Sequence, residues 1–263
     1  MSQQKPKNID EYKDWLRKSQ EVEVSQKTVS YYENVANRIK VDFEKSPFWT
    51  SLLTRNLREY HDEYISATSY PLLMDFSPIL LIKPFDSCLL KSFRKNVTDN
   101  KKWPEEPEGG WILPRNWFSR VNDILRTLLI VKYLDGVEFV ANKLKSYCTD
   151  HGTECQDFLE AREDGYYAAH LYLKRRFEIP KVDWDTEQID VSVEVQVTTQ
   201  LQEVIRKLLH RYYEQQRGKA KGQKKWQWDY GSDEFAANYL GHILHYIEGM
   251  IMDVREKQQE KMP

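Results

Sequence analysis

The stretch Glu163–Tyr172, EDGYYAAHLY, decides the fold class. An acidic turn with one glycine opens into a predicted strand, one face of which carries Tyr166, Ala168, His170 and Tyr172. The small alanines let a flat ring approach the backbone, and a tyrosine offers that ring a stacking surface. We therefore predict a strand that is also a candidate site for a planar ligand.

A second strand is predicted at Val191–Thr199, VSVEVQVTT. Valines at alternate positions form an apolar face and leave Ser192, Glu194 and Gln196 on the other. A glutamate on an open strand face is available for metal or base chemistry. Two further strands are predicted at Ile79–Ile82 and Ile124–Tyr133. Together they indicate an α/β (α+β) fold, a mixed central sheet of about four to five strands flanked by helices.

Helical periodicity surrounds these strands. We expect a helical region at 1–70 packed on the core, a core at 71–217, a basic linker at 218–232 and a C-terminal helix at 233–263. All four parts are expected to form one structural domain, with helical extensions at both ends.

The composition excludes several classes of function. The 39 basic and 41 acidic residues give a net charge of −2, so a general basic field for DNA is absent. The three cysteines have no zinc-finger spacing. Apolar runs are much shorter than the roughly 20 residues of a membrane span. We expect a soluble cytoplasmic protein without a membrane partner.

A candidate phosphate site lies in KPFDSCLLKSFR, which starts at Lys83. On a helix, Ser87, Lys91 and Arg94 fall along one stripe, with Lys83 at the helix entrance. Ammonium groups and a guanidinium fork suit a polyphosphate. A solvated basic face is the alternative interpretation of this segment taken alone.

Two carboxylates complete the candidate site. Asp123 precedes the predicted strand Ile124–Tyr133, where it would be held rigidly, and Glu194 lies on the second strand. If adjacent strands bring them together, they make a two-carboxylate Mg²⁺ site that substrate phosphates complete.

These motifs in this order resemble one family. GYYAAH followed by VEVQVTT, with VNDILRT and KPFDSCLLKSFR upstream, resembles the RelA/SpoT synthetase domain over about Ile79 to Glu214. The EDGYYA form, the Gly-Trp loop before residue 112 and the aromatic C-terminal helix most resemble the toxic small alarmone synthetases of toxin–antitoxin and phage-defence systems.

The resemblance implies a nucleotidyltransferase-like fold and an ATP pyrophosphokinase, which transfers the β,γ-pyrophosphate of ATP to a ribose 3′-hydroxyl. Asp123 would bind Mg²⁺, and Glu194 would bind metal or activate the hydroxyl. Tyr166 would stack on the acceptor, with His170 and Gln196 beside it. The ATP phosphates would be bound by Lys83, Ser87, Lys91, Arg94 and Arg126.

The predicted identity of the acceptor rests on two departures from the family pattern. Housekeeping members carry more basic residues where this chain has Arg162-Glu163-Asp164, Tyr167 and Thr198-Thr199. Fewer cations argue against an acceptor held by 5′-phosphates. The resemblance to the toxin group, some members of which modify the 3′-CCA end of tRNA, then implies tRNA as the first-ranked acceptor, with Lys219–Lys225 as contacts to the RNA backbone. Such a protein would be a growth-inhibiting toxin with a possible antitoxin partner. The alternatives are synthesis of (p)ppGpp or (pp)pApp from nucleotide substrates, and an inactive relative that binds a partner.

Overall fold

The computed structural model describes residues 4–180, 185–216 and 225–259, without the side chains of 209–216. The predicted RNA contact at Lys219–Lys225 therefore lies, except for Lys225, outside the described residues. Within them, no helix is long and apolar enough to cross a membrane.

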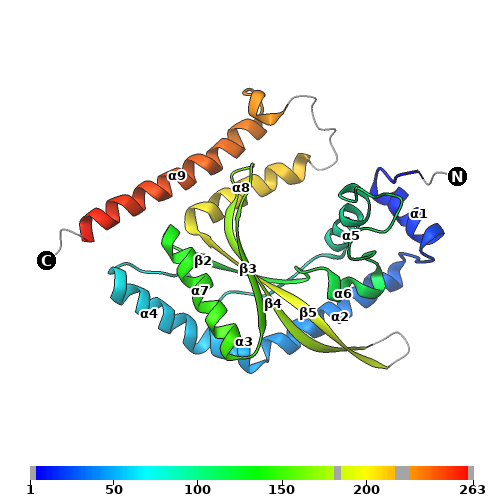
Figure 1. The fold of residues 1–263 in the computed structure, drawn as a ribbon, viewed down its shortest axis with the longest axis horizontal. Coiled ribbons are helices and arrows are strands. Elements are labelled where there is room, and N and C mark those ends of the chain that lie inside the picture. The colour runs from blue at the N-terminus through cyan, green and yellow to red at the C-terminus, as the bar shows by residue number, and fades with distance from the viewer. Residues whose placement is uncertain (1–3, 181–184, 217–224, 260–263) are drawn as a thin grey trace. The chain divides into compact units, whose positions relative to one another are not determined.

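The described residues form a five-stranded sheet with the order β1-β2-β5-β4-β3 (Figure 1). Its strands are β1 (Leu81–Ile82), β2 (Leu125–Val131), β3 (Glu154–Ala161), β4 (Tyr167–Pro180) and β5 (Thr186–Thr199). β1 and β2 pair antiparallel, with Leu81 opposite Arg126. The mixed sheet with flanking helices confirms the predicted α/β class.

The chain divides into two compact units. Unit one comprises Met1–Thr50, Leu80–Thr127 and Tyr172–Glu194, and unit two comprises Ser51–Ile79, Leu128–Leu171 and Val195–Pro263. The unit boundaries fall within β2, β4 and β5, so each of these strands contributes residues to both units.

Unit one contains α1 (Ile9–Ser19), α2 (Gln26–Glu44), α5 (Phe85–Phe93) and α6 (Trp117–Arg120). α1 begins at Asn8, whose side chain accepts hydrogen bonds from the backbone N–H of Asp10 and Glu11. α5 continues into a π-helix, Arg94–Thr98, and a 3-10 turn, Pro114–Asn116, leads into α6. α3 (Pro47–Ser51) ends where unit two begins.

Unit two contains α4 (Leu57–Thr68), α7 (Leu134–Asp150), α8 (Gln200–Gln216) and α9 (Asp233–Gln259). A π-helix, Leu52–Asn56, precedes α4, and a 3-10 turn, Trp226–Trp228, precedes α9. Figure 1 shows α8 and α9 side by side. Gly136 lies in the first turn of α7, where an added Cβ would be 2.9 Å from the side chain of Leu72.

β3 has no counterpart among the predicted strands. Most of its side chains are exposed, so its sequence lacks the alternation of apolar and polar residues that marks a half-buried strand. A tight turn joins β3 to β4: the N–H of Arg162 donates to Tyr166 O at 3.0 Å, and Gly165 has a φ of +79°.

Candidate functional site

Asp123 is held between two lysines in unit one. The Nζ of Lys83 donates to Asp123 Oδ2 at 2.7 Å, and the Nζ of Lys91 donates to Oδ1 at 2.8 Å. Burial by itself would raise the pKa of Asp123, but the charges of Lys91 and Lys83 outweigh it, and the pKa lies below its usual value. The carboxylate is therefore ionised at neutral pH, and the three groups together carry one net positive charge.

Local contacts of the backbone place Lys83. Its N–H donates to the carbonyl of Ile124 at 2.8 Å, and its own carbonyl accepts the hydroxyl of Tyr32 at 2.8 Å. α5 begins at Phe85, two residues later, and brings Lys91 round to the same carboxylate. Burial raises the pKa of the neighbouring Cys88 to about 12, so this thiol is protonated and is no nucleophile.

The other residues expected to bind ATP do not contact Asp123 among the described contacts. Arg94 starts the π-helix and is exposed, with its Nη2 3.9 Å from Asp99 Oδ2. Ser87 is half-buried on α5, one turn before Lys91, and Arg126 is half-buried on β2 opposite Leu81. Of the stripe expected on one helix face, Lys91 alone contacts Asp123 among the described contacts.

Glu194 lies on β5 and is buried. Its carboxylate accepts the hydroxyl of Tyr172, on β4, at 3.1 Å. The alternation of β5 is as predicted, since its alternate valines are fully buried. The expectation that Glu194 lies on an open face is wrong, because only 4% of the residue is exposed.

Unit two contains the residues expected at the acceptor. The hydroxyl of Tyr166 is 3.3 Å from His170 Nε2, and the guanidinium of Arg162 lies 4.9 Å from the centre of the Tyr166 ring. Glu160 contacts both Arg162 and His170: its Oε1 lies 2.6 Å from Arg162 Nε, and its Oε2 lies 3.0 Å from His170 Nε2. Phe158 stacks on His170 with parallel rings 5.3 Å apart. Gln196 is half-buried on β5.

Three residues of this cluster, Phe158, Glu160 and Arg162, were not among the predicted site residues. Phe158 and Glu160 lie on β3, the strand that the sequence did not reveal. The Asp164-Gly165 pair is the signal that could have found them, since Asp-Gly between two extended segments is a strong hairpin signal.

α9 fixes the turn that carries Tyr166. Gly165 and Gly241 approach so closely that a Cβ on Gly241 would lie 2.5 Å from the carbonyl oxygen of Gly165. His242 Nε2 donates to the carbonyl of Glu163 at 2.9 Å, so in the neutral ring Nδ1 accepts the hydroxyl of Tyr167, also at 2.9 Å. The Tyr167 ring stacks on His245 with centres 3.6 Å apart.

Asp123 and Glu194 supply hard carboxylate oxygens, which suit Mg²⁺. Both oxygens of Asp123 already accept lysine N–H groups, and within the described residues no group of three or more His, Cys, Asp or Glu side chains is placed to hold a metal ion. None of the described contacts joins Asp123 to Glu194, so each could supply at most its own carboxylate oxygens to an ion, which would have to take its other ligands from substrate phosphates and water.

No protein-family model matches the sequence, and no curated protein matches it. Solved structures do. Small alarmone synthetase 1 from Bacillus subtilis matches with a TM-score of 0.54 and 14% identity, over 89% of this chain and 97% of that one. The same synthetase bound to its product pppGpp matches with 0.53 and 15%, over the same shares.

A GTP pyrophosphokinase family protein from Streptococcus pneumoniae matches with a TM-score of 0.53 and 13% identity, over 89% of this chain and 94% of that one. At these identities the shared property is the fold. The chain therefore has the fold of the small alarmone synthetases, as the sequence motifs predict.

Proposed function

We propose that the protein is an ATP-dependent pyrophosphokinase that makes an alarmone from a nucleotide. The 3′-oxygen of the acceptor ribose forms a bond to the β-phosphorus of ATP, the bond from that phosphorus to the α,β-bridging oxygen breaks, and AMP leaves with the bridging oxygen. The observation that carries the proposal is the ionised Asp123 between Lys83 and Lys91, in the fold of the synthetases.

This cluster suits the donor side of the reaction. Transfer of a pyrophosphoryl group needs positive charge and in-line positioning more than covalent chemistry. Lys83 and Lys91 are partly exposed, so phosphate oxygens of ATP can accept hydrogen bonds from their ammonium groups in place of Asp123. Asp123, freed from them, would hold Mg²⁺ together with Glu194. When bound, Mg²⁺ neutralises charge on the phosphates.

Glu194 is proposed to take the proton of the acceptor 3′-hydroxyl. The Glu194 carboxylate is buried and accepts the hydroxyl of Tyr172, which keeps it in position, and a carboxylate held in this way is suited to act as a general base. Tyr172 is a positioning residue that orients Glu194.

The acceptor is proposed to be a guanosine nucleotide that stacks on Tyr166. The B. subtilis neighbours include complexes with pppGpp and with AMPCPP, the latter with a TM-score of 0.50 and 14% identity over 89% of this chain. The sequence predicts tRNA because this chain has fewer cations at the acceptor than housekeeping members do. The guanidinium of Arg162 lies 4.9 Å from the centre of the Tyr166 ring and is paired with Glu160. A phosphate of the acceptor could replace Glu160 on this guanidinium, which supports an acceptor with its own phosphates. Action on tRNA as a toxin, with an antitoxin, stays a prediction.

The test is transfer of label from [γ-³²P]ATP to GDP, GTP, adenine nucleotides or deacylated tRNA, each offered separately. We expect labelled guanosine products and AMP in equal amounts, and loss of transfer with Glu194→Gln. Label on tRNA alone would restore the first sequence-based ranking. Absence of transfer to every acceptor, with ATP intact, would reject the pyrophosphokinase and favour a partner-binding protein.

A further inference from the structure

Two of the three cysteines, Cys148 and Cys155, are in contact where the chain passes from α7 into β3. Cys148 lies in the last turn of α7, and Cys155 is the second residue of β3. A hydrogen bond joins their side chains, and both are free thiols. Thiols in hydrogen-bond contact need only a small side-chain movement to reach the length of a disulfide bond. The pair is therefore a candidate site of oxidation.

Backbone hydrogen bonds close the turn between the two cysteines. The N–H of Thr153 donates to the carbonyl of Cys148 at 2.8 Å, and the N–H of Gly152 donates to the carbonyl of Thr149 at 3.0 Å. Gly152 has a φ of +59°, so α7 ends in a Schellman motif. This defined turn holds the start of β3 beside the end of α7. The backbone therefore sets the contact between Cys148 and Cys155.

A salt bridge holds the same face of β3 against α7. The Nζ of Lys145, on α7, lies 2.9 Å from the Oδ1 of Asp157, on β3. Side chains alternate along a strand, so Cys155 and Asp157 lie on one face of β3. Lys145 and Cys148 are three residues apart and lie on one face of α7. The contact between the cysteines thus belongs to the packing of α7 on β3.

The two thiols differ as an attacking and a resolving thiol differ. Cys148 is buried, whereas Cys155 is only half-buried. The hydrogen bond from Cys148 lowers the pKa of Cys155, and the charge of Lys145 lowers it further, so that together they outweigh burial and the charge of Asp157, which raise it. Cys155 therefore supplies the nucleophilic thiolate. Cys88 differs from both, because it is buried and its pKa is raised to about 12.

We propose that Cys148 and Cys155 form a reversible disulfide bond when the protein meets hydrogen peroxide. The thiolate of Cys155 attacks a peroxide oxygen: the S–O bond forms, the O–O bond breaks, and hydroxide leaves and takes up a proton to become water. The sulfur of Cys148 then attacks the sulfur of this sulfenic acid: the S–S bond forms, the S–O bond breaks, and the leaving hydroxide takes the Cys148 proton as a second water. Two thiols lose two electrons, and the peroxide gains them.

The bond ties an exposed edge strand to the helix beneath it. The other face of β3 carries Phe158, which stacks on His170, and Glu160, which lies 3.0 Å from the same ring. A covalent link between α7 and β3 therefore restrains the strand that packs against His170. The inference does not depend on the reaction that the protein catalyses, because the bond is measured directly.

The test is peptide mass spectrometry of the reduced full-length chain after treatment with equimolar hydrogen peroxide. Cleavage before Asp150 and Asp157 separates the cysteines, so the bond should join a peptide that ends at Thr149 to the peptide that ends at Gln156. The wild type should lose two of its three titratable thiols, and dithiothreitol should restore them. Because the bond closes a short loop, oxidation should raise the melting temperature by an amount on the order of 5 °C.

Single substitutions separate the two steps. Cys148→Ser should leave Cys155 as a sulfenic acid that dimedone captures, whereas Cys155→Ser should leave Cys148 unreacted at the same dose. Cys88→Ser is the matched control and should form the bond as the wild type does. Circular dichroism establishes that each variant is folded, and the wild-type peptides test the bond even where a variant does not fold.

Several results would overturn the proposal. They are a folded wild type that keeps its three thiols, a bond that involves Cys88 or joins two chains, and a bond that forms only after unfolding in urea. Dimedone capture in Cys155→Ser but not in Cys148→Ser would contradict the assigned order of the two steps and equally overturn it.

Discussion

The guanidinium of Arg162 lies over the ring of Tyr166, 4.9 Å from its centre, and Glu160 holds it there. The same carboxylate lies 3.0 Å from His170, whose ring is edge-on to Tyr166. A guanidinium fixed on a tyrosine extends the planar stacking surface, while its pairing with Glu160 offsets the positive charge. We regard this pair as the seat of the acceptor base in the proposed reaction.

Arg162→Ala should raise the KM for the acceptor nucleotide. A cation–π contact contributes about 0.5–2 kcal/mol, so the change is expected to be about 2- to 30-fold, with a much smaller effect on the KM for ATP. Initial rates with each substrate varied in turn measure it. Arg176→Ala is the control, because Arg176 is exposed and pairs only at the surface with Asp190 among its described contacts. Equal effects of the two substitutions would show that Arg162 has no special relation to the acceptor.

Asp123→Asn should abolish transfer and change the dependence of stability on pH. The folded-state pKa of Asp123 lies below its usual value of 3.8, because Lys91 and Lys83 outweigh the effect of burial. The ionised carboxylate therefore stabilises the fold above that usual value, and the stabilisation disappears as the pH falls through the folded-state pKa.

Urea unfolding at pH 7, 5 and 3 tests this linkage. We expect the wild type to exceed Asp123→Asn in stability at pH 7 and 5, and the difference to shrink by pH 3. Asp253→Asn, which removes an exposed carboxylate paired with Lys257, is the control and should change little at any pH. A difference that is constant across the three pH values would contradict the prediction.

Gly241→Ala should destabilise the fold, whereas Gly249→Ala should not. Both glycines lie on α9, but an added Cβ at Gly241 meets the carbonyl oxygen of Gly165 at 2.5 Å, and one at Gly249 meets nothing within 4 Å. In an open helical position alanine is favoured over glycine by up to about 1 kcal/mol. Overpacking typically costs about 1–3 kcal/mol. Thermal unfolding should therefore shift in opposite directions, and a shift of the same sign would contradict the close approach of α9 to the turn.

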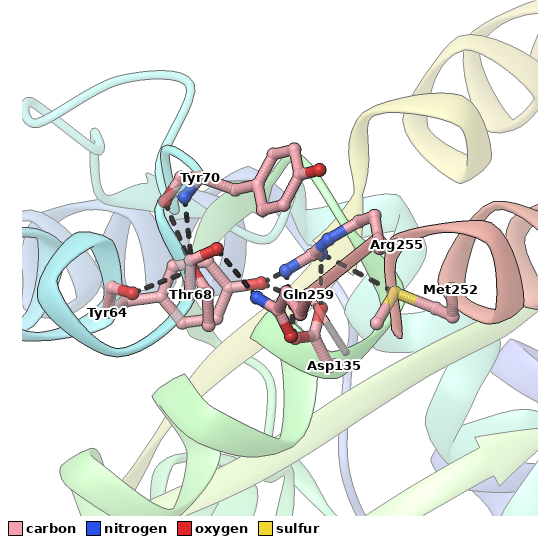
Figure 2. Close-up of polar contacts among 7 residues, drawn as sticks. All are labelled: Tyr64, Thr68, Tyr70, Asp135, Met252, Arg255 and Gln259. Carbon is pink, nitrogen blue, oxygen red and sulfur yellow. Dashed lines mark hydrogen bonds and ion pairs between the residues drawn. The ribbon is translucent and has the colours of Figure 1, made fainter. Parts of the chain in front are cut away.

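Asp135→Asn should destabilise the protein by about 3 kcal/mol, because it leaves the charge of Arg255, whose side chain is only 6% exposed, without its partner (Figure 2). Arg255→Met should cost less, since the side chain of Asp135 is 36% exposed and water can solvate the carboxylate that remains. The double variant should cost less than the sum of the two, which a double-mutant cycle measures. Lys257→Met, on the exposed side of the same helix, should change stability by at most about 0.5 kcal/mol.

The strands could be predicted where one face is buried, as on β5 with its four buried valines. β3 lacks this signal, because an exposed edge strand needs no apolar alternation, and only the Asp164-Gly165 turn points to it. The expected stripe of Lys91 and Arg94 assumed one continuous α-helix. The chain instead changes to a π-helix at Arg94, which alters the number of residues per turn and directs that arginine to Asp99.

The contacts of Asp123 and Glu194 show a second limit of prediction from the sequence. The sequence marks Lys83, Lys91 and Asp123 as charged residues near strand and helix ends, but their distances depend on how β1 pairs with β2. The bond from Tyr172 to Glu194 likewise requires the register of β4 against β5, which alternation alone leaves undefined.

Because Gly165 and Gly241 have no side chains, the backbone of the turn before β4 packs directly against the backbone of α9. A displacement of the helix must be transmitted to that turn, and with it to Tyr166. An inhibitor of this protein would therefore not have to resemble a nucleotide. A molecule that binds the exposed apolar side of α9 and tilts the helix would deform the proposed acceptor site from a distance, and its binding surface would be apolar rather than charged.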